Sequence, residues 1–191
     1  MRKNIKEFIG KQFHLIFNRE NVEVVVTALV LALIIRTFVV QAFKIPTGSM
    51  RTTLIEGDRI LVNKFIYRFK EPKRGDIIVF KYPEEPKKDF IKRLIAFGGE
   101  TVEIVDGDIL VDGEPVRDGS KIEEIYYYNK AGTEFGEEGA IIEVPEDSFF
   151  VLGDNSASSR DSRYWGFVPK KNLVGNAFIL YWPPKRIRFL K

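Results

Sequence analysis

The sequence predicts a mostly β domain that follows one apolar N-terminal helix. Residues 24–35 form an unbroken run of apolar or small residues, VVVTALVLALII. After residue 56 the chain consists of short runs rich in β-branched and aromatic residues, separated by turn signals. No segment there keeps a helical period for more than a turn or two. We therefore expect antiparallel β-sheets that are coiled or closed into a partial barrel.

Residues 1–21 carry the whole excess charge of the chain. The 191 residues have a formal net charge of +3, and this tail holds five basic residues against two acidic ones. An excess beside an apolar segment indicates a membrane surface, whereas a nucleic-acid binder carries it on the folded domain. Apolar residues from Ile5 to Phe17 recur at helical spacing, which is typical of an amphipathic helix lying on a membrane. A short self-packed helix is the alternative.

Residues 22–43 are long enough to cross a bilayer, which needs about 20 apolar residues. Arg36 lies near one end, where its side chain can reach the headgroups. Because the basic residues precede this segment, we expect a single-pass protein of the cytoplasmic membrane, with a cytoplasmic N-terminus and residues 44–191 outside. A buried core helix is one alternative. A cleavable signal peptide, with small residues at Val40-Gln41-Ala42, is the other.

The strand-like runs follow one another at short intervals. They are residues 59–67, 76–82, 90–97, 101–105, 108–111, 141–144, 149–152 and 176–182. Asp106-Gly107 separates two of them, and this dipeptide predicts a β-hairpin. Residues 119–139 lack alternation, so we expect a long loop or an irregular hairpin there.

Composition excludes several kinds of chemistry. The chain has no cysteine, and its one histidine, His14, precedes the apolar segment. A Ser-His-Asp triad is therefore excluded if the predicted topology holds. No His/Asp/Glu cluster has zinc-ligand spacing, and no glycine-rich phosphate loop is present. We expect no metal and no cofactor, which leaves a serine activated by lysine or by carboxylates.

Ser49 is the candidate nucleophile. It lies in Ile45-Pro46-Thr47-Gly48-Ser49-Met50, shortly after the apolar segment. Proline restricts one backbone angle and glycine permits an unusual one, so this turn can hold an exposed serine in a set geometry. An ordinary loop has the same pattern.

Lys92 is a candidate base because it alternates with apolar residues along a predicted strand. Side chains two apart share a face, and this face holds Phe90, Lys92, Leu94 and Ala96. Burial disfavours the ammonium form and lowers a lysine pKa, as a catalytic base requires. Arg93 points to the other face and cannot lose its proton. Lys64 has a similar setting, so alternation does not choose between the two lysines.

Residues 153–163, GDNSASSRDSR, are the densest polar segment. They hold two aspartates, two arginines and four serines directly after an apolar strand. Aromatic residues follow, so we expect a buried polar network here, with a solvated loop as the alternative.

Five segments, in order along the chain, resemble the bacterial type I signal peptidases, also called leader peptidases. Behind an apolar segment that ends Arg-Thr-Phe-Val, these are residues 45–50, 57–65, 74–80, 91–95 and 153–166. The resemblance implies a fold of coiled antiparallel β-sheets. It implies a serine endopeptidase that removes signal peptides from exported preproteins through an acyl-enzyme, after small residues at the first and third positions before the cut.

The resemblance also implies residue roles. Ser49 would be the nucleophile and Lys92 the general base, while the Ser49 N–H and the Thr47 hydroxyl would form the oxyanion hole. Lys64 receives no catalytic role. The supporting residues are in the last segment: Ser159 would hydrogen-bond to Lys92 and orient it, Asp161 and Arg163 would pair, and Gly153 and Asp154 belong to the same segment.

Residues 96–100 depart from the usual family pattern, which leaves the conformation of that turn open, and Ser156 and Arg160 are less typical. The implied partners are signal peptides of secreted preproteins and membrane phospholipid, without nucleic acid, and the chain is expected to be a monomer. One alternative is a Ser-Lys peptidase with a single dedicated substrate, against which cleavage of several unrelated signal peptides would argue. Another is a non-catalytic, membrane-anchored β-domain, against which Ser49, Lys92 and Thr47 argue.

Overall fold

The computed structural model describes residues 19–34, 36 and 39–190 and divides into two compact units, residues 1–39 and 40–191. In the first unit, helix α2 spans Arg19–Ile34. Its apolar side chains are exposed on all sides, with Val24 67% and Leu33 61% accessible. Across the described residues, no helix is both long and apolar enough to cross a membrane. Most of the predicted amphipathic tail, His14 included, lies outside these residues.

Strand β1, Val40–Lys44, opens the second unit. It pairs antiparallel with β2, Arg59–Asn63, so that Val40 lies opposite Asn63 and Lys44 opposite Arg59. The predicted end of the apolar helix at residue 43 is therefore wrong, because residues 40–43 belong to the β domain. The same apolar residues suit a half-buried strand and a membrane helix, and only the pairing with β2 separates the two.

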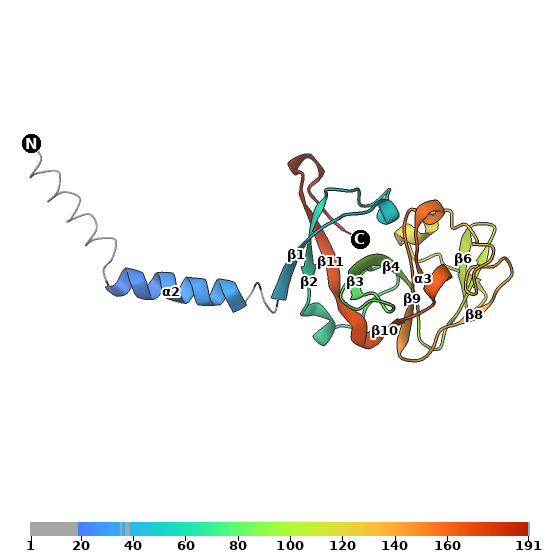
Figure 1. The fold of residues 1–191 in the computed structure, drawn as a ribbon, viewed down its shortest axis with the longest axis horizontal. Helices are drawn as coiled ribbons and strands as arrows, with labels where there is room; N and C mark the ends of the chain where they lie inside the picture. Colours follow the sequence, from blue (N-terminus) through green and yellow to red (C-terminus); the bar gives the residue numbers. More distant parts are fainter. Residues whose placement is uncertain (1–18, 35, 37–38, 191) are drawn as a thin grey trace, which may run out of the picture. The chain divides into compact units, whose positions relative to one another are not determined.

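The larger sheet of the domain has the strand order β1-β2-β11-β3-β4-β9-β10, with β12 paired to β11, and all its pairs are antiparallel (Figure 1). Its other strands are β3 Ile77–Lys81, β4 Asp89–Phe97, β9 Ser148–Leu152, β10 Val168–Pro169, β11 Leu173–Trp182 and β12 Arg188–Phe189. Register shifts interrupt the pairs of β11 and the pair β4–β9. Such irregularities bend and twist strands, which fits a coiled sheet.

The smaller sheet has the order β7-β6-β5-β8. Its strands are β5 Thr101–Val105, β6 Asp108–Val111, β7 Glu114–Pro115 and β8 Ile142–Glu143. Asp106 and Gly107 have φ angles of 49° and 89°, as a two-residue hairpin turn requires. The predicted hairpin and the mostly β, antiparallel fold are confirmed.

The predicted strand over residues 59–67 is too long. The carboxamide oxygen of Asn63 accepts the backbone N–H groups of Phe65 and Ile66, and a 3-10 turn, η3, follows at Ile66–Arg68. This side-chain cap ends the strand, as asparagine commonly does in turns. Residues 119–139 form a loop, as predicted, with one 3-10 turn, η4, at Lys121–Glu124.

The atypical turn at residues 96–100 has a close approach at its centre. A Cβ on Gly98 would lie 1.9 Å from the Glu146 carbonyl oxygen, so only glycine fits there. Gly99 has a φ of 85°, which also favours glycine. The Glu100 carboxylate accepts the backbone N–H of Phe97 and pairs with Arg74.

A buried apolar cluster anchors the chain on either side of residues 46–49. It includes Met50 and Leu54, both fully buried, packed with Ile60, Val62 and Leu180 from β2 and β11. Because Met50 directly follows Ser49, its burial holds the backbone next to Ser49 in place. Large-to-small substitutions at such sites typically cost about 2–5 kcal/mol.

Candidate active site

Ser49 lies in a turn that is held at both ends. The Ile45 N–H donates to the Asp58 carbonyl at 2.8 Å, and the Gly57 N–H donates to the Ile45 carbonyl at 2.9 Å. Gly48–Met50 then form one 3-10 turn, η2. Ser49 is half-buried between the buried Ile45 and Met50, so its hydroxyl is positioned by backbone bonds and by the core.

Lys92 meets Ser49 from strand β4. Its Nζ lies 2.7 Å from Ser49 Oγ and 3.0 Å from the Ile91 carbonyl oxygen. The side chain is 3% exposed, and this burial lowers the pKa of Lys92 to about 8. Asp161 and Asp154 oppose the shift in pKa, and Arg163 adds to it. A useful fraction of the amine is therefore neutral near pH 7 to 8, when it can accept the serine proton.

The loop after β9 clamps the nucleophile turn. The Asn155 backbone N–H donates to the Ser49 carbonyl at 3.1 Å, and its Nδ2 donates to the Gly48 carbonyl at 2.9 Å. A Cβ on Gly153 would lie 2.4 Å from the Ser49 carbonyl oxygen, so glycine allows this close approach. Asn155 belongs to the last segment of the resemblance, which implied no role for it.

Two fully buried ion pairs flank Lys92. The first joins Arg93 to Asp154, with Nε–Oδ1 and Nη2–Oδ2 distances of 2.8 and 2.6 Å. Arg93 also donates to the Gly75 carbonyl, and the Thr53 hydroxyl donates to Asp154. Because Arg93 and Lys92 are adjacent on β4, this pair fixes the strand that presents the amine. This pair was not predicted from the sequence, where the only signal is that Arg93 alternates with Lys92 along the strand and so points to the other face.

The second ion pair joins Asp161 to Arg163. The Nε–Oδ1 and Nη2–Oδ2 distances are 2.8 and 2.7 Å, and both side chains are fully buried. The Asp161 carboxylate also accepts the Gly153 N–H at 3.0 Å. The pairing was predicted. Through the bond to Gly153, the ion pair also holds the backbone that lies against the Ser49 carbonyl.

The predicted hydrogen bond from Ser159 to Lys92 is wrong. The Ser159 hydroxyl is buried and has no hydrogen-bond partner among the described residues. It packs instead against Gly153, where a Cβ would lie only 2.2 Å from the Ser159 Oγ. The Lys92 amine donates to Ser49 and Ile91 instead. The position of Ser159 in the sequence does not reveal the direction of its side chain.

Thr47 and Ser49 line the same cleft. Thr47 precedes η2 in an extended conformation, and its hydroxyl makes no capping bond to that turn. Amides in the first turn of a helix have no acceptor within it, which applies to the Ser49 N–H. Both residues that are predicted to supply the oxyanion donors therefore line the cleft.

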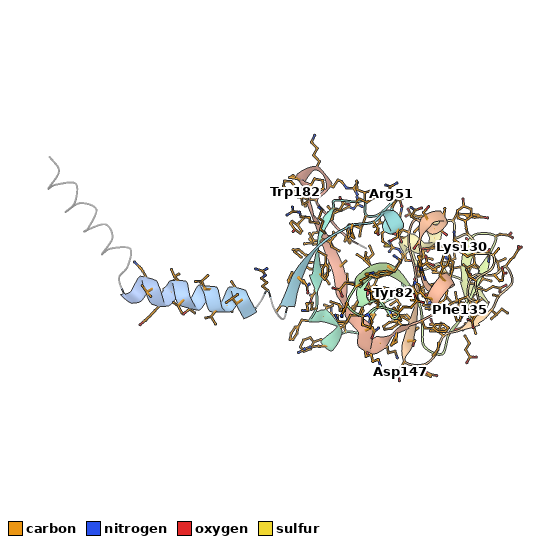
Figure 2. All side chains as sticks on the ribbon, in the orientation of Figure 1. Arg51, Tyr82, Lys130, Phe135, Asp147 and Trp182 are labelled. Atoms are coloured by element: carbon orange, nitrogen blue, oxygen red, sulfur yellow. The ribbon has the colours of Figure 1, made fainter. Side chains whose placement is uncertain are left out.

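The cleft has a volume of about 490 Å³. One wall is formed by residues 46–49, which enter the 3-10 turn η2, and the other includes residues 89–92 of β4. These residues pair with β3 on one side, whereas pairing with β9 begins only at Arg93. The second backbone edge of residues 89–92 is thus left open by the sheet. Arg51, labelled in Figure 2, pairs with Glu56 at the rim.

Lys64 is absent from the cleft. It is half-buried, follows the last residue of β2, and lies against Gly175, whose Cβ position is 3.0 Å from the Lys64 Cα. Among the described residues, no group of three or more His, Asp or Glu side chains is placed to hold a metal ion.

A serine hydroxyl bonded to a buried lysine amine, beside an open strand edge, is the geometry of a serine peptidase that uses lysine as its base. Residues 18–182 match the model of the family described as signal peptidase, peptidase S26. The chain belongs to this family, and it is a peptidase.

Its relatives extend across bacteria. A signal peptidase I of Leptolyngbya laminosa is 42% identical over 175 residues, which cover 88% of this chain and 81% of the relative. A signal peptidase I of Aquifex aeolicus is 38% identical over 204 residues, covering 80% of each. The crystal structure of a signal peptidase I from Enterococcus faecalis superposes with a TM-score of 0.46 at 33% identity, over 56% of this chain and 97% of that one.

Proposed function

We propose that this peptidase removes N-terminal signal peptides from exported preproteins, with Ser49 as nucleophile and Lys92 as general base. The observation that carries the proposal is the 2.7 Å contact between Lys92 Nζ and Ser49 Oγ, made by an amine that is 3% exposed. A lysine at its ordinary pKa of about 10.4 is almost wholly protonated near neutral pH and cannot act as this base. Burial supplies the shift.

The reaction proceeds in two halves. The neutral Lys92 amine takes the Ser49 proton as Ser49 Oγ attacks the scissile carbonyl carbon, and the ammonium then protonates the departing amine of the mature protein. The signal peptide remains as an ester on Ser49. Lys92 next deprotonates a water molecule that attacks this ester, and the serine regains its proton.

The negative charge that develops on the carbonyl oxygen needs donors. The Ser49 N–H and the Thr47 hydroxyl are the proposed pair, supported by the presence of both residues in the cleft lining. Loss of one such donor typically lowers kcat by about 10²–10³-fold. Asp154, Asp161, Arg163, Gly153 and Ser159 are proposed as supporting residues, with Ser159 acting by packing on Gly153.

The substrate is proposed to bind as an added strand. The open edge of residues 89–92 offers backbone groups along one side of the cleft, and residues 46–49 line the other side. In an extended peptide, the first and third residues before the cut face the same way and so meet the same wall. We propose that this wall admits only small side chains, so a Phe-x-Phe site should be cleaved slower by orders of magnitude. Equal cleavage of that site would contradict this specificity.

The chain is further proposed to be a single-pass membrane protein in which residues 1–21 are cytoplasmic and the β domain, residues 40–191, lies outside. Support comes from the exposed apolar side chains of α2 and from the basic residues that precede them. Cleavage after Ala42 would remove three of the five residues of β1, which argues for a retained anchor. Protease added to spheroplasts should digest the domain; protection of the domain would contradict this topology.

Action as a monomer is proposed as well, with membrane phospholipid around the exposed apolar side chains of α2 as the other partner. The decisive assay uses the full chain in detergent, several unrelated preproteins, and a Ser49→Ala control. Cleavage of all of them by the wild type alone is expected. Cleavage of a single preprotein would favour a dedicated peptidase.

A further inference from the structure

Part of the long loop packs on the catalytic segment without lining the cleft. We call residues 126–136 the strap. The Tyr128 N–H donates to Ser156 Oγ at 2.8 Å, and the Lys130 amine donates to the Ala157 carbonyl at 2.9 Å. Both acceptors lie in the 3-10 turn η5, Ser156–Ser158, between the clamp at Asn155 and the ion pair at Asp161.

The strap also closes over the helix that carries Arg163. This helix, α3, spans Ser162–Trp165. A Cβ on Gly136 would lie 3.0 Å from the Arg163 Cβ, so the strap backbone lies directly against this arginine. The ring of Phe135 packs on Phe167 with centroids 5.2 Å apart. Lys130 and Phe135 are labelled in Figure 2.

Every N–H of the buried Arg163 guanidinium is used. Nε and Nη2 bind Asp161, Nη2 also donates to the Ser156 carbonyl at 3.0 Å, and Nη1 donates to the Tyr128 carbonyl at 2.6 Å and to Ser156 Oγ at 2.9 Å. A guanidinium has five N–H donors, so none is left over. Three of the five acceptors are on the strap or on Ser156, and Asp161 supplies only two.

We infer that the strap is a positioning device for the catalytic pair, and that Ser156 is the positioning residue that joins the strap to Arg163. Ser156 Oγ is the one atom that accepts from both the Tyr128 N–H and the Arg163 guanidinium. It is 4% exposed and touches neither Ser49 nor Lys92 in any hydrogen bond shown by the structure. The inference rests on the Ser-Lys mechanism proposed above.

The strap acts on Lys92 through charge. Asp161 and Asp154 raise the pKa of Lys92, and Arg163 lowers it against them. When Arg163 is displaced, the Asp161 carboxylate stabilises the ammonium form, and less of the amine is neutral at a given pH. Other charged groups lie nearby. Asp89 and Arg160 line the cleft, and Arg93 is paired with Asp154 on the other face of β4. On the strap, Lys130 interacts electrostatically with Asp161 and Arg163.

The test is the pH profile of kcat/KM for Ser156→Ala in the full chain, measured with a peptide that spans an Ala-x-Ala site. We expect the rising limb to move about half a pH unit or more to higher pH, so that activity falls about threefold at pH 7 and recovers at pH 9.5. A merely structural role would lower activity equally at every pH. A profile that coincides with the wild type, or falls equally throughout, would overturn the inference.

Ser162→Ala is the matched control. Ser162 is also buried and lies in the same segment, and its hydroxyl accepts the Val151 N–H at 3.0 Å without a hydrogen bond to the Arg163 guanidinium. Its pH profile should stay in place, and an equal shift in this variant would contradict a specific role for Ser156.

If Ser156→Ala does not fold, Lys130→Gln replaces it, with the exposed Lys171→Gln as its control. A shift in the first alone supports the inference, and no shift in either overturns it. A wild-type profile without any rising limb would instead contradict the Ser-Lys mechanism itself, so the two failures are distinguishable.

Discussion

Lys92 and Lys64 have similar sequence surroundings and opposite fates in the structure. Lys92 lies within the nine-residue strand β4, between β3 and β9 in the strand order, and is 3% exposed. Lys64 comes just after β2 ends and is half-buried outside the cleft. Alternation with apolar residues therefore does not make a base. The two lysines differ because Lys92 is almost completely buried and its amine donates to Ser49, a residue 43 positions away in the chain.

The largest effect is expected at Lys92 itself. Lys92→Arg keeps the positive charge but cannot act as a base, because arginine does not lose its proton in proteins. Cleavage of a preprotein should fall by at least about 10²–10⁴-fold, as for Lys92→Ala, with circular dichroism unchanged. Near-normal turnover by the arginine variant would show that Lys92 supplies only charge, and the Ser-Lys mechanism would have to be abandoned.

Removal of Asp161 tests the surroundings that Lys64 lacks. Asp161→Ala leaves the buried Arg163 without its carboxylate, and breaking a buried pair in this way costs about 3–5 kcal/mol. Both the free energy of unfolding in urea and the cleavage rate should fall. If the rate falls while stability is unchanged, the pair acts only by local positioning, and the argument from burial is wrong.

Lys92→Met should stabilise the protein near neutral pH. The folded-state pKa of Lys92 is lowered from 10.5 to about 8, so the penalty is complete below pH 8 and vanishes above the unfolded value. At pH 7 the free energy of unfolding should rise by about 3 kcal/mol, and the gain should shrink as pH increases toward 10.5. A gain that is independent of pH would point to packing rather than to charge burial.

The rate should follow the neutral fraction of Lys92. Below pH 8, kcat/KM should rise about tenfold per pH unit and then level off, because the free enzyme must lose one proton. A stopped assay over pH 6 to 9.5 with one peptide measures this. A profile that is flat over this range would rule out a base with the lowered pKa.

Lys64→Ala should have the smallest effect. The residue lies outside the cleft and is half-buried. The free energy of unfolding should therefore change by no more than about 0.5 kcal/mol, and most of the activity should remain. Its pH profile should coincide with that of the wild type. A loss comparable to that of Lys92→Ala would remove the distinction between the two lysines.

Much of the fold followed from local patterns. The hairpin at Asp106-Gly107, the loop over residues 119–139 and most strands were predicted from turn chemistry and alternation, which act over a few residues. The errors fall where local patterns are ambiguous. Residues 40–43 suit both a membrane helix and a strand, and the side-chain cap at Asn63 shortens a run that looks continuous.

The sequence by itself determined which chemistry was possible. The absence of cysteine and the position of His14 left a serine with a lysine or carboxylates, and the ordered segments named Ser49 and Lys92 through their resemblance to a family. Only the tertiary structure decided how the pair is held. Three of its features join residues far apart in the chain: the Asn155 clamp, the Arg93–Asp154 pair and the contact of the strap with Arg163. A fourth, the direction of the Ser159 side chain, is not set by its position in the sequence. The physical reason is that burial and partner geometry belong to the packed molecule, because desolvation of Lys92 arises from the strands that enclose it.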